Sequence, residues 1–403
     1  MFVKIVHPRY FTIVYVPSPS PMNRRNFFEK AIPASFALGA VASSCAPKTQ
    51  LYYPDKHFHI GRGYHQIPKL RLSMDRIVKE TVGLRPFRAS GPRLDVEQLG
   101  NKTIVHNYGH GGSGWSLSWG TGNIARKNVL ATNEKKIAVI GCGTVGIATA
   151  RLLQESGCEV TIYTKDVPPN VTSNLATGTW SPASRVCDVK VAKPEFKDIW
   201  EEATRFSFRR FQFFLGLNDI ACWAEEYGVF KQVPVYTPGA GGEDFEAHGL
   251  IPEHVKLEAK EHPFNAGHVT RRTNLMFNIP SYLRHQMQDF VMFGGKIKIQ
   301  EIKKLEDIDA LPEKVIVNCM GLGAKPVFND QELTPVSGQL SCLIPQSDVN
   351  YKLYTQGANF ISRKDGIYIG SNGIVGNWDT TPSKEQTEKT VGILMKLMEE
   401  MKG

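Results

Sequence analysis

The stretch from Lys135 to Thr164 constrains the fold more than any other part of the chain. It reads as a strand (KKIAVIG), a turn (GCGTVG), a helix (TVGIATARLLQESG) and a second strand (CEVTIYT), which is the order of a βαβ unit. Gly141 permits the tight turn, Gly143 lets the backbone approach a pyrophosphate, and Gly146 lets the helix pack closely on the strand. The free N–H groups at the start of the helix favour a bound anion. The unit therefore predicts a dinucleotide site of the Rossmann type.

The end of the second strand carries the residues expected near a ribose. In such units a carboxylate stands about 20 residues beyond the glycines, and Asp166 lies at that distance. Lys165 precedes it and offers a positive charge to a phosphate group. This lysine keeps a 2′-phosphorylated nicotinamide cofactor open as an alternative.

Length and composition exclude several classes of protein. The chain has 403 residues, 41 % of them hydrophobic and 22 % charged, which is enough for two domains with their own cores. The net charge is +9, but no basic tract with interleaved aromatic residues is present, so we do not expect nucleic acid as a partner. The seven cysteines show no CxxC spacing, and neither a metal site nor a disulfide framework is predicted. Nothing in the sequence indicates an oligomeric state.

The N-terminal region resembles an export signal. Residues 22–45 read MNRRNFFEKAIPASFALGAVASSC, with Arg24 and Arg25 ahead of a short apolar run, which is the layout of a twin-arginine signal. The run from Ala31 to Ala42 is shorter than the roughly 20 residues that a membrane-spanning helix needs. Cys45 follows small residues as in a lipoprotein cleavage box, and is a candidate lipid anchor. We expect residues 1–45 to be an upstream extension with this signal, residues 46–60 to be a linker, and the protein to be exported to the periplasm or cell envelope.

Four further segments resemble the D-amino-acid oxidase family, whose cofactor is FAD. They are HNYGHGGSGWSLSWG (106–120), VTSNLATGTWSP (171–182), KVIVNCMGLGA (314–324) and VGLRPFRASGPRL (82–94). In that family the first of these segments lies close to the end of the chain. Here it precedes the βαβ unit, and the stretch from Thr121 to Glu134 joins the two. The resemblance therefore implies a circular permutation.

The resemblance also implies a two-domain fold of the α/β class. A Rossmann-like FAD-binding domain is expected over residues 84–199 and 311–340. A second, α+β substrate domain with its own sheet is expected over residues 61–83, 200–310 and 341–403, and the two occur in circularly permuted order. The strand-like segments KIKIQEI and IYIGSN are assigned to the sheet of the substrate domain.

The same resemblance assigns site residues. Arg85 matches the arginine that holds the substrate carboxylate, Gly112 lies in the glycine segment beside the flavin, and His268 takes the place of a tyrosine that covers the substrate. A helix expected after Gly120 is to point its positive end toward the flavin. The residues expected to bind FAD are Gly141, Gly143, Thr144, Val145, Gly146, Lys165, Asp166, Thr172, Ser173, Gly178, Thr179, Gly321, Gly111, Gly112, Ser113, Gly114, Trp115 and Ser116.

The implied activity is the oxidation of D-amino acids to 2-oxo acids, with release of ammonia and hydrogen peroxide. In this family a hydride passes from the α-carbon to flavin N5, and oxygen accepts the electrons. Two alternatives stay open. One is an NAD(P)-dependent dehydrogenase, which Lys165 favours; the other is a non-catalytic exported binding lipoprotein on the same fold, which the missing lid tyrosines favour.

Overall fold

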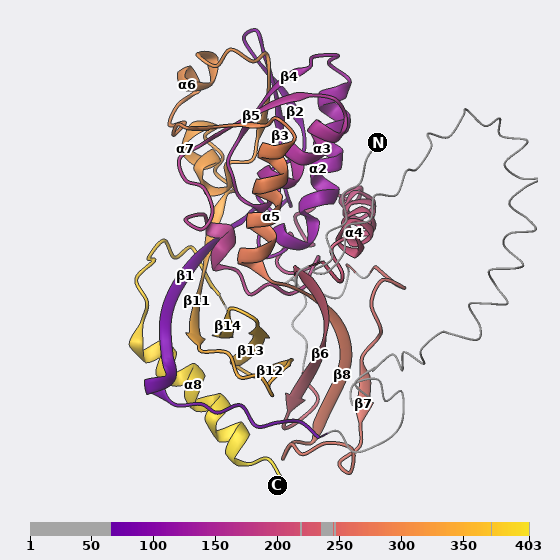
Figure 1. The fold of residues 1–403 in the computed structure, drawn as a ribbon, viewed down its shortest axis with the longest axis vertical. Coiled ribbons are helices and arrows are strands. Elements are labelled where there is room, and N and C mark those ends of the chain that lie inside the picture. The colour runs from indigo at the N-terminus through magenta and orange to yellow at the C-terminus, as the bar shows by residue number, and fades with distance from the viewer. Residues whose placement is uncertain (1–65, 218–219, 235–244, 246, 372, 403) are drawn as a thin grey trace, which may run out of the picture. The chain divides into compact units, whose positions relative to one another are not determined.

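The computed structural model describes residues 66–402, except 218–219, 235–244, 246 and 372. The predicted export signal, Cys45 and the linker at 46–60 lie outside the described residues. The described chain contains a six-stranded sheet and a nine-stranded sheet (Figure 1). Among its helices, none combines the length and the apolar character needed to cross a membrane.

The six-stranded sheet is built around the predicted βαβ unit. Its order is β2 (Val96–Leu99), β3 (Lys102–His106), β10 (Val315–Asn318), β4 (Lys136–Ile140), β5 (Glu159–Thr164) and β9 (Lys296–Ile299). All neighbours are parallel except β2 and β3. The helix of the βαβ unit is α3 (Thr144–Glu155), as the sequence predicted.

Both faces of this sheet are buried, which explains why its strands read as continuous apolar runs. One face packs against α2 (Gly114–Leu130), α3 and α5 (Ile279–Met292), and the other against α6 (Leu305–Asp309) and α7 (Ala324–Val327). Alternate residues serve the two faces, because side chains along a strand point to opposite sides. Val105, Val139 and Val317 belong to the first core, and Ile104, Ala138 and Ile316 to the second.

The nine-stranded sheet draws on both ends of the described chain. Its order is β1 (Ile77–Phe87), β11 (Thr334–Leu343), β14 (Gly366–Gly370), β13 (Ala358–Arg363), β12 (Tyr351–Thr355), β6 (Ala221–Phe230), β8 (His268–Phe277) and β7 (Val255–Leu257), with β15 (Ile374–Val375) also paired to β11. The C-terminal helix α8 (Lys384–Glu399) lies along this sheet (Figure 1). The remaining helix, α4 (Phe196–Gln212), packs on α2.

The two faces of the nine-stranded sheet differ sharply in polarity. The face toward α8 buries apolar side chains, among them Leu353, Phe360 and Ile369. The opposite face follows from the register: Lys352 pairs with Glu226, and Glu226 pairs with Arg272, so these three charged residues share one side. By the same register, Arg85 on β1 lies on the side of the sheet that carries Lys352. We call this second side the polar face.

The structure departs from the expected domain division in three places. The segment KIKIQEI forms β9, which pairs with β5 in the six-stranded sheet, and α5 packs on α3. Residues 279–299 therefore belong with the cofactor-type sheet and not with the substrate sheet. The boundaries at 83/84 and 340/341 fall inside β1 and β11, because these two strands pair continuously from Lys79 to Phe87.

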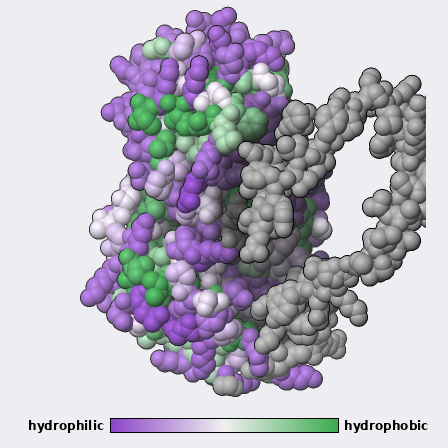
Figure 2. Space-filling model, in the orientation of Figure 1, coloured by the Kyte–Doolittle hydropathy of each residue, from purple (hydrophilic) through white to green (hydrophobic). Residues whose placement is uncertain are grey.

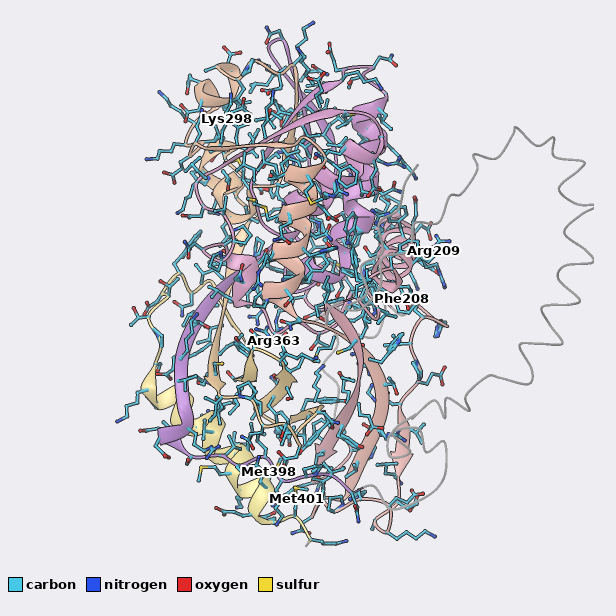
Figure 3. The ribbon with its side chains drawn as sticks, in the orientation of Figure 1. Phe208, Arg209, Lys298, Arg363, Met398 and Met401 are labelled. Carbon is cyan, nitrogen blue, oxygen red and sulfur yellow. The ribbon has the colours of Figure 1, made fainter. Side chains whose placement is uncertain are left out.

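The first and last described segments lie together. The Lys69 ammonium donates to the carbonyl oxygen of Met401 at 2.9 Å, and the Leu70 amide donates to Sδ of Met398 at 3.3 Å. Both methionines are labelled beside α8 in Figure 3. The surface in Figure 2 is mostly hydrophilic, with hydrophobic residues in scattered groups, which is ordinary for a folded protein surface.

Candidate functional site

A cavity of about 770 Å³ opens at the carboxyl ends of β4, β5 and β10. This is the edge at which open α/β sheets bind their ligands. The cavity also reaches β1 of the nine-stranded sheet. Its lining includes most of the predicted site residues: Arg85, Gly111, Gly112, Gly114, Trp115, Gly141, Gly143, Thr144, Val145, Gly146, Lys165, Asp166, Thr172, Ser173 and Gly321.

The glycine turn between β4 and α3 leaves no room for side chains. Gly141 has a φ of +106°, and a Cβ added there would lie 2.5 Å from the carbonyl oxygen of Cys319. A Cβ on Gly146 would overlap the carbonyl oxygen of Gly141. The first helical residue is Thr144, whose amide donates to Oγ of Ser173 at 2.9 Å and whose own Oγ1 is buried without a hydrogen-bond partner. An unpaired hydroxyl at a helix N-terminus suits a phosphate group.

At the end of β5 the cavity meets solvent. Lys165 and Asp166 both line it, with 3.8 Å between Nζ and the carboxylate, and both side chains are exposed. A carboxylate in this position can accept hydrogen bonds from ribose hydroxyls.

The glycine segment Gly109 to Gly114 forms another wall. Gly111 has a φ of +58°, and a Cβ on Gly112 would lie 2.6 Å from Oγ of Ser184. The expected helix start after Gly120 is wrong, because α2 begins at Gly114. Gly120 lies inside α2, and its missing side chain makes room for the backbone of Ala203 on α4. It is a close-packing glycine and not a helix breaker.

Two histidines near this wall are held neutral. His110 lines the cavity, its Nε2 lies 3.0 Å from Oγ1 of Thr121, and burial lowers its pKa to about 3. In His106, Nε2 lies 3.0 Å from the Glu97 carboxylate and Nδ1 lies 3.1 Å from Nδ2 of Asn318. Burial lowers the pKa of His106 as well. Both rings are therefore uncharged hydrogen-bonding groups at neutral pH.

Arg85 on β1 brings a positive charge to the cavity. Its guanidinium lies over Gly338, where an added Cβ would be 2.7 Å from Nη2, and next to Gly373. Nη1 is buried and has no hydrogen-bond partner. Burial, and then the neighbouring charge of Arg185, lower the pKa of Arg85 to about 10. A half-buried cation with a like charge beside it and an unused donor is suited to bind an anion.

Five predicted residues do not line the cavity. Ser113 donates to the carbonyl oxygen of His110 at 2.6 Å, and the Ser116 hydroxyl accepts from the Ser181 amide at 2.8 Å. The others are Gly178, Thr179 and His268.

Gly178 and Thr179 serve the nine-stranded sheet instead. The Gly178 carbonyl accepts from the Phe277 amide at 2.7 Å, and Thr179 forms a β-bridge with Met276. His268 begins β8 opposite Phe230, and is not among the residues around the cavity. The resemblance places His268 where the family has a tyrosine over the substrate. In the structure, β8 and β1, which carries Arg85, lie near opposite edges of the nine-stranded sheet.

Sequence reasoning missed two parts of the lining. Gln300, Glu301 and Ile302 follow β9, and would have been expected there had β9 been assigned to the parallel sheet. Leu175 to Thr177 lie inside the predicted loop at 171–182 but were not assigned to the site, and they also line the cavity. Leu175 contacts Gly83, where an added Cβ would be 3.1 Å from its Cβ.

The comparison with known families now decides the assignment. The family model of the FAD dependent oxidoreductases, DAO, matches residues 136–402. The chain belongs to this DAO family. The family assignment and the predicted FAD cofactor are confirmed by this match. The two sheets confirm the predicted fold of a Rossmann-like domain with a second domain that has its own sheet. The nicotinamide alternative that Lys165 left open is not supported.

Similar proteins include two curated relatives. A D-amino acid oxidase from Dugesia ryukyuensis is 26 % identical over 264 residues, which cover 62 % of this chain and 74 % of the relative. A D-amino-acid oxidase from Dictyostelium discoideum is 25 % identical over 259 residues, covering 63 % and 70 %. Among solved structures, L-proline dehydrogenase from P. horikoshii is 14 % identical with a TM-score of 0.44, covering 65 % of this chain and 78 % of that one.

The cavity fits the cofactor of the family. The turn from Gly141 to Gly146 excludes side chains where a pyrophosphate approaches, and the buried Oγ1 of Thr144 has an unused hydrogen-bonding capacity beside it. Asp166 stands at the ribose end of the same cavity, and the glycine wall at Gly111 and Gly112 leaves space for a flat ring. These residues would hold FAD along the cavity from Asp166 toward Arg85.

Proposed function

We propose that this protein is a FAD-dependent D-amino-acid oxidase. The overall reaction converts a D-amino acid, oxygen and water into a 2-oxo acid, ammonia and hydrogen peroxide. The observation that carries the proposal is the position of Arg85, a cation with an unused buried donor in the same cavity as the cofactor turn. A planar guanidinium binds a carboxylate through two parallel hydrogen bonds, and so fixes the orientation of the bound amino acid.

The other residues around the cavity are suited to orient the bound ligands and not to transfer protons. When bound, FAD supplies the acceptor of the two electrons that leave the substrate. His110 is held neutral by burial and His106 is tied to Glu97 and Asn318, so neither offers a charged acid to the cavity. The α2 N-terminus at Gly114 and Trp115 faces the cavity and provides partial positive charge there.

A panel of D- and L-amino acids tests the proposal. Purified, FAD-loaded protein should release hydrogen peroxide and 2-oxo acid in equal amounts with D-amino acids, and should do so faster than with the matching L-enantiomers. The proposal fails if an L-amino acid is a better substrate than every D-amino acid, or if no amino acid yields peroxide above a heat-denatured control.

We also propose that the chain order is a circular permutation of the family order. Two observations support it. The family match begins at residue 136. The elements before that residue nevertheless belong to the same fold, because β1 is a strand of the nine-stranded sheet, β3 is a strand of the six-stranded sheet, and the start of α2 lines the cavity. In addition, the first described segment lies against the chain's end, through Lys69 and Met401. A short connection would therefore suffice to join the two ends.

A further inference from the structure

The segment 172–177 crosses the cavity and is fixed at its cofactor end. Thr172, Ser173, Leu175, Ala176 and Thr177 all line the cavity. Oγ of Ser173 accepts from the first amide of α3, and the Ser173 carbonyl accepts from Nε1 of Trp115 at 3.0 Å. The middle of the segment contacts β1, since Leu175 packs on Gly83, two residues before Arg85. The segment thus touches both the cofactor turn and the strand of the carboxylate-binding arginine.

The other end is held by one side chain from the nine-stranded sheet. Arg363, the last residue of β13 (labelled in Figure 3), donates from Nη1 to the carbonyl oxygen of Ala176 at 2.9 Å and to that of Thr177 at 3.2 Å. Its side chain is only 1 % exposed. Thr172–Leu175 form one short 3-10 helical turn, and Ala176 and Thr177 follow it outside any strand, so these two bonds satisfy carbonyl oxygens that no sheet ladder reaches.

Arg363 is itself held rigidly. Nε and Nη2 donate to the two oxygens of Asp365 at 2.8 and 2.6 Å, and the guanidinium lies 3.7 Å from the centroid of the Tyr368 ring. The Tyr368 hydroxyl donates to the same carboxylate at 2.8 Å. The charge is paired and the donors are used, so burial of this arginine is compensated and its direction is fixed.

We propose that Arg363 is a positioning residue for both ligands, because it fixes segment 172–177 across the cavity. By fixing this segment, Arg363 sets the position of Ser173 beside the cofactor turn. It also sets the position of Leu175 against Gly83, two residues before Arg85. The part of this proposal that concerns the amino acid rests on the proposed function, whereas the part that concerns FAD does not.

Three variants test the proposal. Arg363→Met removes the hydrogen bonds to the segment and to Asp365. Arg363→Lys keeps the positive charge beside Asp365, but an ammonium cannot make all the hydrogen bonds of the planar guanidinium. Arg151→Met is the matched control: Arg151 has a side chain only 7 % exposed, lies over the Phe293 ring at 4.6 Å, and stands 4.0 Å from the carboxylates of Glu155 and Asp289, none of which lines the cavity. The control measures what the loss of a buried, paired arginine does to stability alone.

The readouts are the Kd of FAD for the apoprotein, amide hydrogen exchange of residues 173–177 in the apoprotein, and the separate values of kcat and KM. Loss of hydrogen bonds to a charged donor should raise the FAD Kd at least about tenfold in Arg363→Met, with a smaller rise in Arg363→Lys. Amide hydrogen exchange of residues 173–177 should be faster in both Arg363 variants. The KM for the amino acid should rise by a larger factor than the factor by which kcat falls. Arg151→Met should change the melting temperature without these effects.

The proposal is overturned if Arg363→Met binds FAD with the wild-type Kd and shows unchanged exchange in 173–177, or if Arg151→Met reproduces its effects. Should Arg363→Met fail to fold, Arg363→Lys decides by the same criteria. The FAD titration and the exchange measurement need no substrate. A protein that oxidises no D-amino acid would therefore contradict the proposed function and still leave this test complete.

Discussion

Gly338 on β11 provides the surface on which the Arg85 guanidinium lies. A Cβ at position 338 would be 2.7 Å from Nη2 and 2.8 Å from Cζ of Arg85, and closer still to Nη1. Gly373 lies on the other side of the guanidinium, where an added Cβ would be 3.2 Å from Nη1. The arginine can take its position only because Gly338 and Gly373 have no side chains.

Gly338→Ala should therefore displace Arg85 without removing its charge. We expect KM for a D-amino acid to rise at least about tenfold, since misplacing a positioning group by about 1 Å has effects of that size or larger. The Kd of FAD should stay at the wild-type value. Gly370→Ala on β14 is the control, because its Cβ would meet the flexible end of Leu340. Equal KM values for both variants would refute this role of Gly338.

Arg85 should lower the stability of the protein when no substrate is bound. It is half-buried, its Nη1 has no partner, and burial together with Arg185 lowers its pKa. Arg85→Met removes this unpaired charge and should raise the melting temperature by about 1–2 °C, which corresponds to roughly 1 kcal/mol in a protein of this size. Differential scanning calorimetry of the substrate-free holoprotein measures the shift. A lower melting temperature would show that Arg85 is compensated by contacts that stabilise the fold.

The pH dependence of stability should report His110. Burial lowers the pKa of this ring to about 3, so the folded state resists a proton that the unfolded state accepts near pH 6.5. The unfolded state then binds more protons between these two values, and stability must fall as the pH drops from about 6.5 toward 3. His110→Gln should flatten this part of the curve of unfolding free energy against pH, measured with urea. An unchanged slope in the variant would mean that other groups cause it.

The proposed permutation predicts that the chain tolerates a new order. A chain that begins at Lys135, runs to Lys402, and continues through a flexible linker into residues 66–131 keeps every described strand and helix whole. The new break falls in the turn between α2 and β4, and the new joint lies where Lys69 meets Met401. We expect a soluble protein that binds FAD. If the rearranged chain is insoluble or binds no FAD, although its linker is long enough to span the gap, the result would argue against the proposal.

The sequence predicted the cofactor half well and the domain boundaries poorly, for a physical reason. The βαβ unit is local, because its strands, turn and helix follow one another and each glycine has one steric role. Strand β9 is decided by a partner more than a hundred residues earlier, and its pattern KIKI fits either sheet. Gly120 shows the same limit: its role depends on Ala203 of another helix, which no local pattern records. Arg363 was missed because its partners at 176–177 are distant in the chain and are backbone carbonyls.

The most direct test of the central claim is the steady-state kinetics of Arg85→Ala and Arg85→Lys with the best D-amino acid, beside the FAD Kd of each variant. Loss of a charge-assisted bidentate pair should lower kcat/KM about a hundredfold or more in Arg85→Ala. Arg85→Lys should recover only part of it, because an ammonium lacks the planar fork. FAD binding should survive in both. If Arg85→Ala oxidises the D-amino acid with near wild-type kcat/KM, Arg85 does not hold the substrate and the proposed active site is wrong.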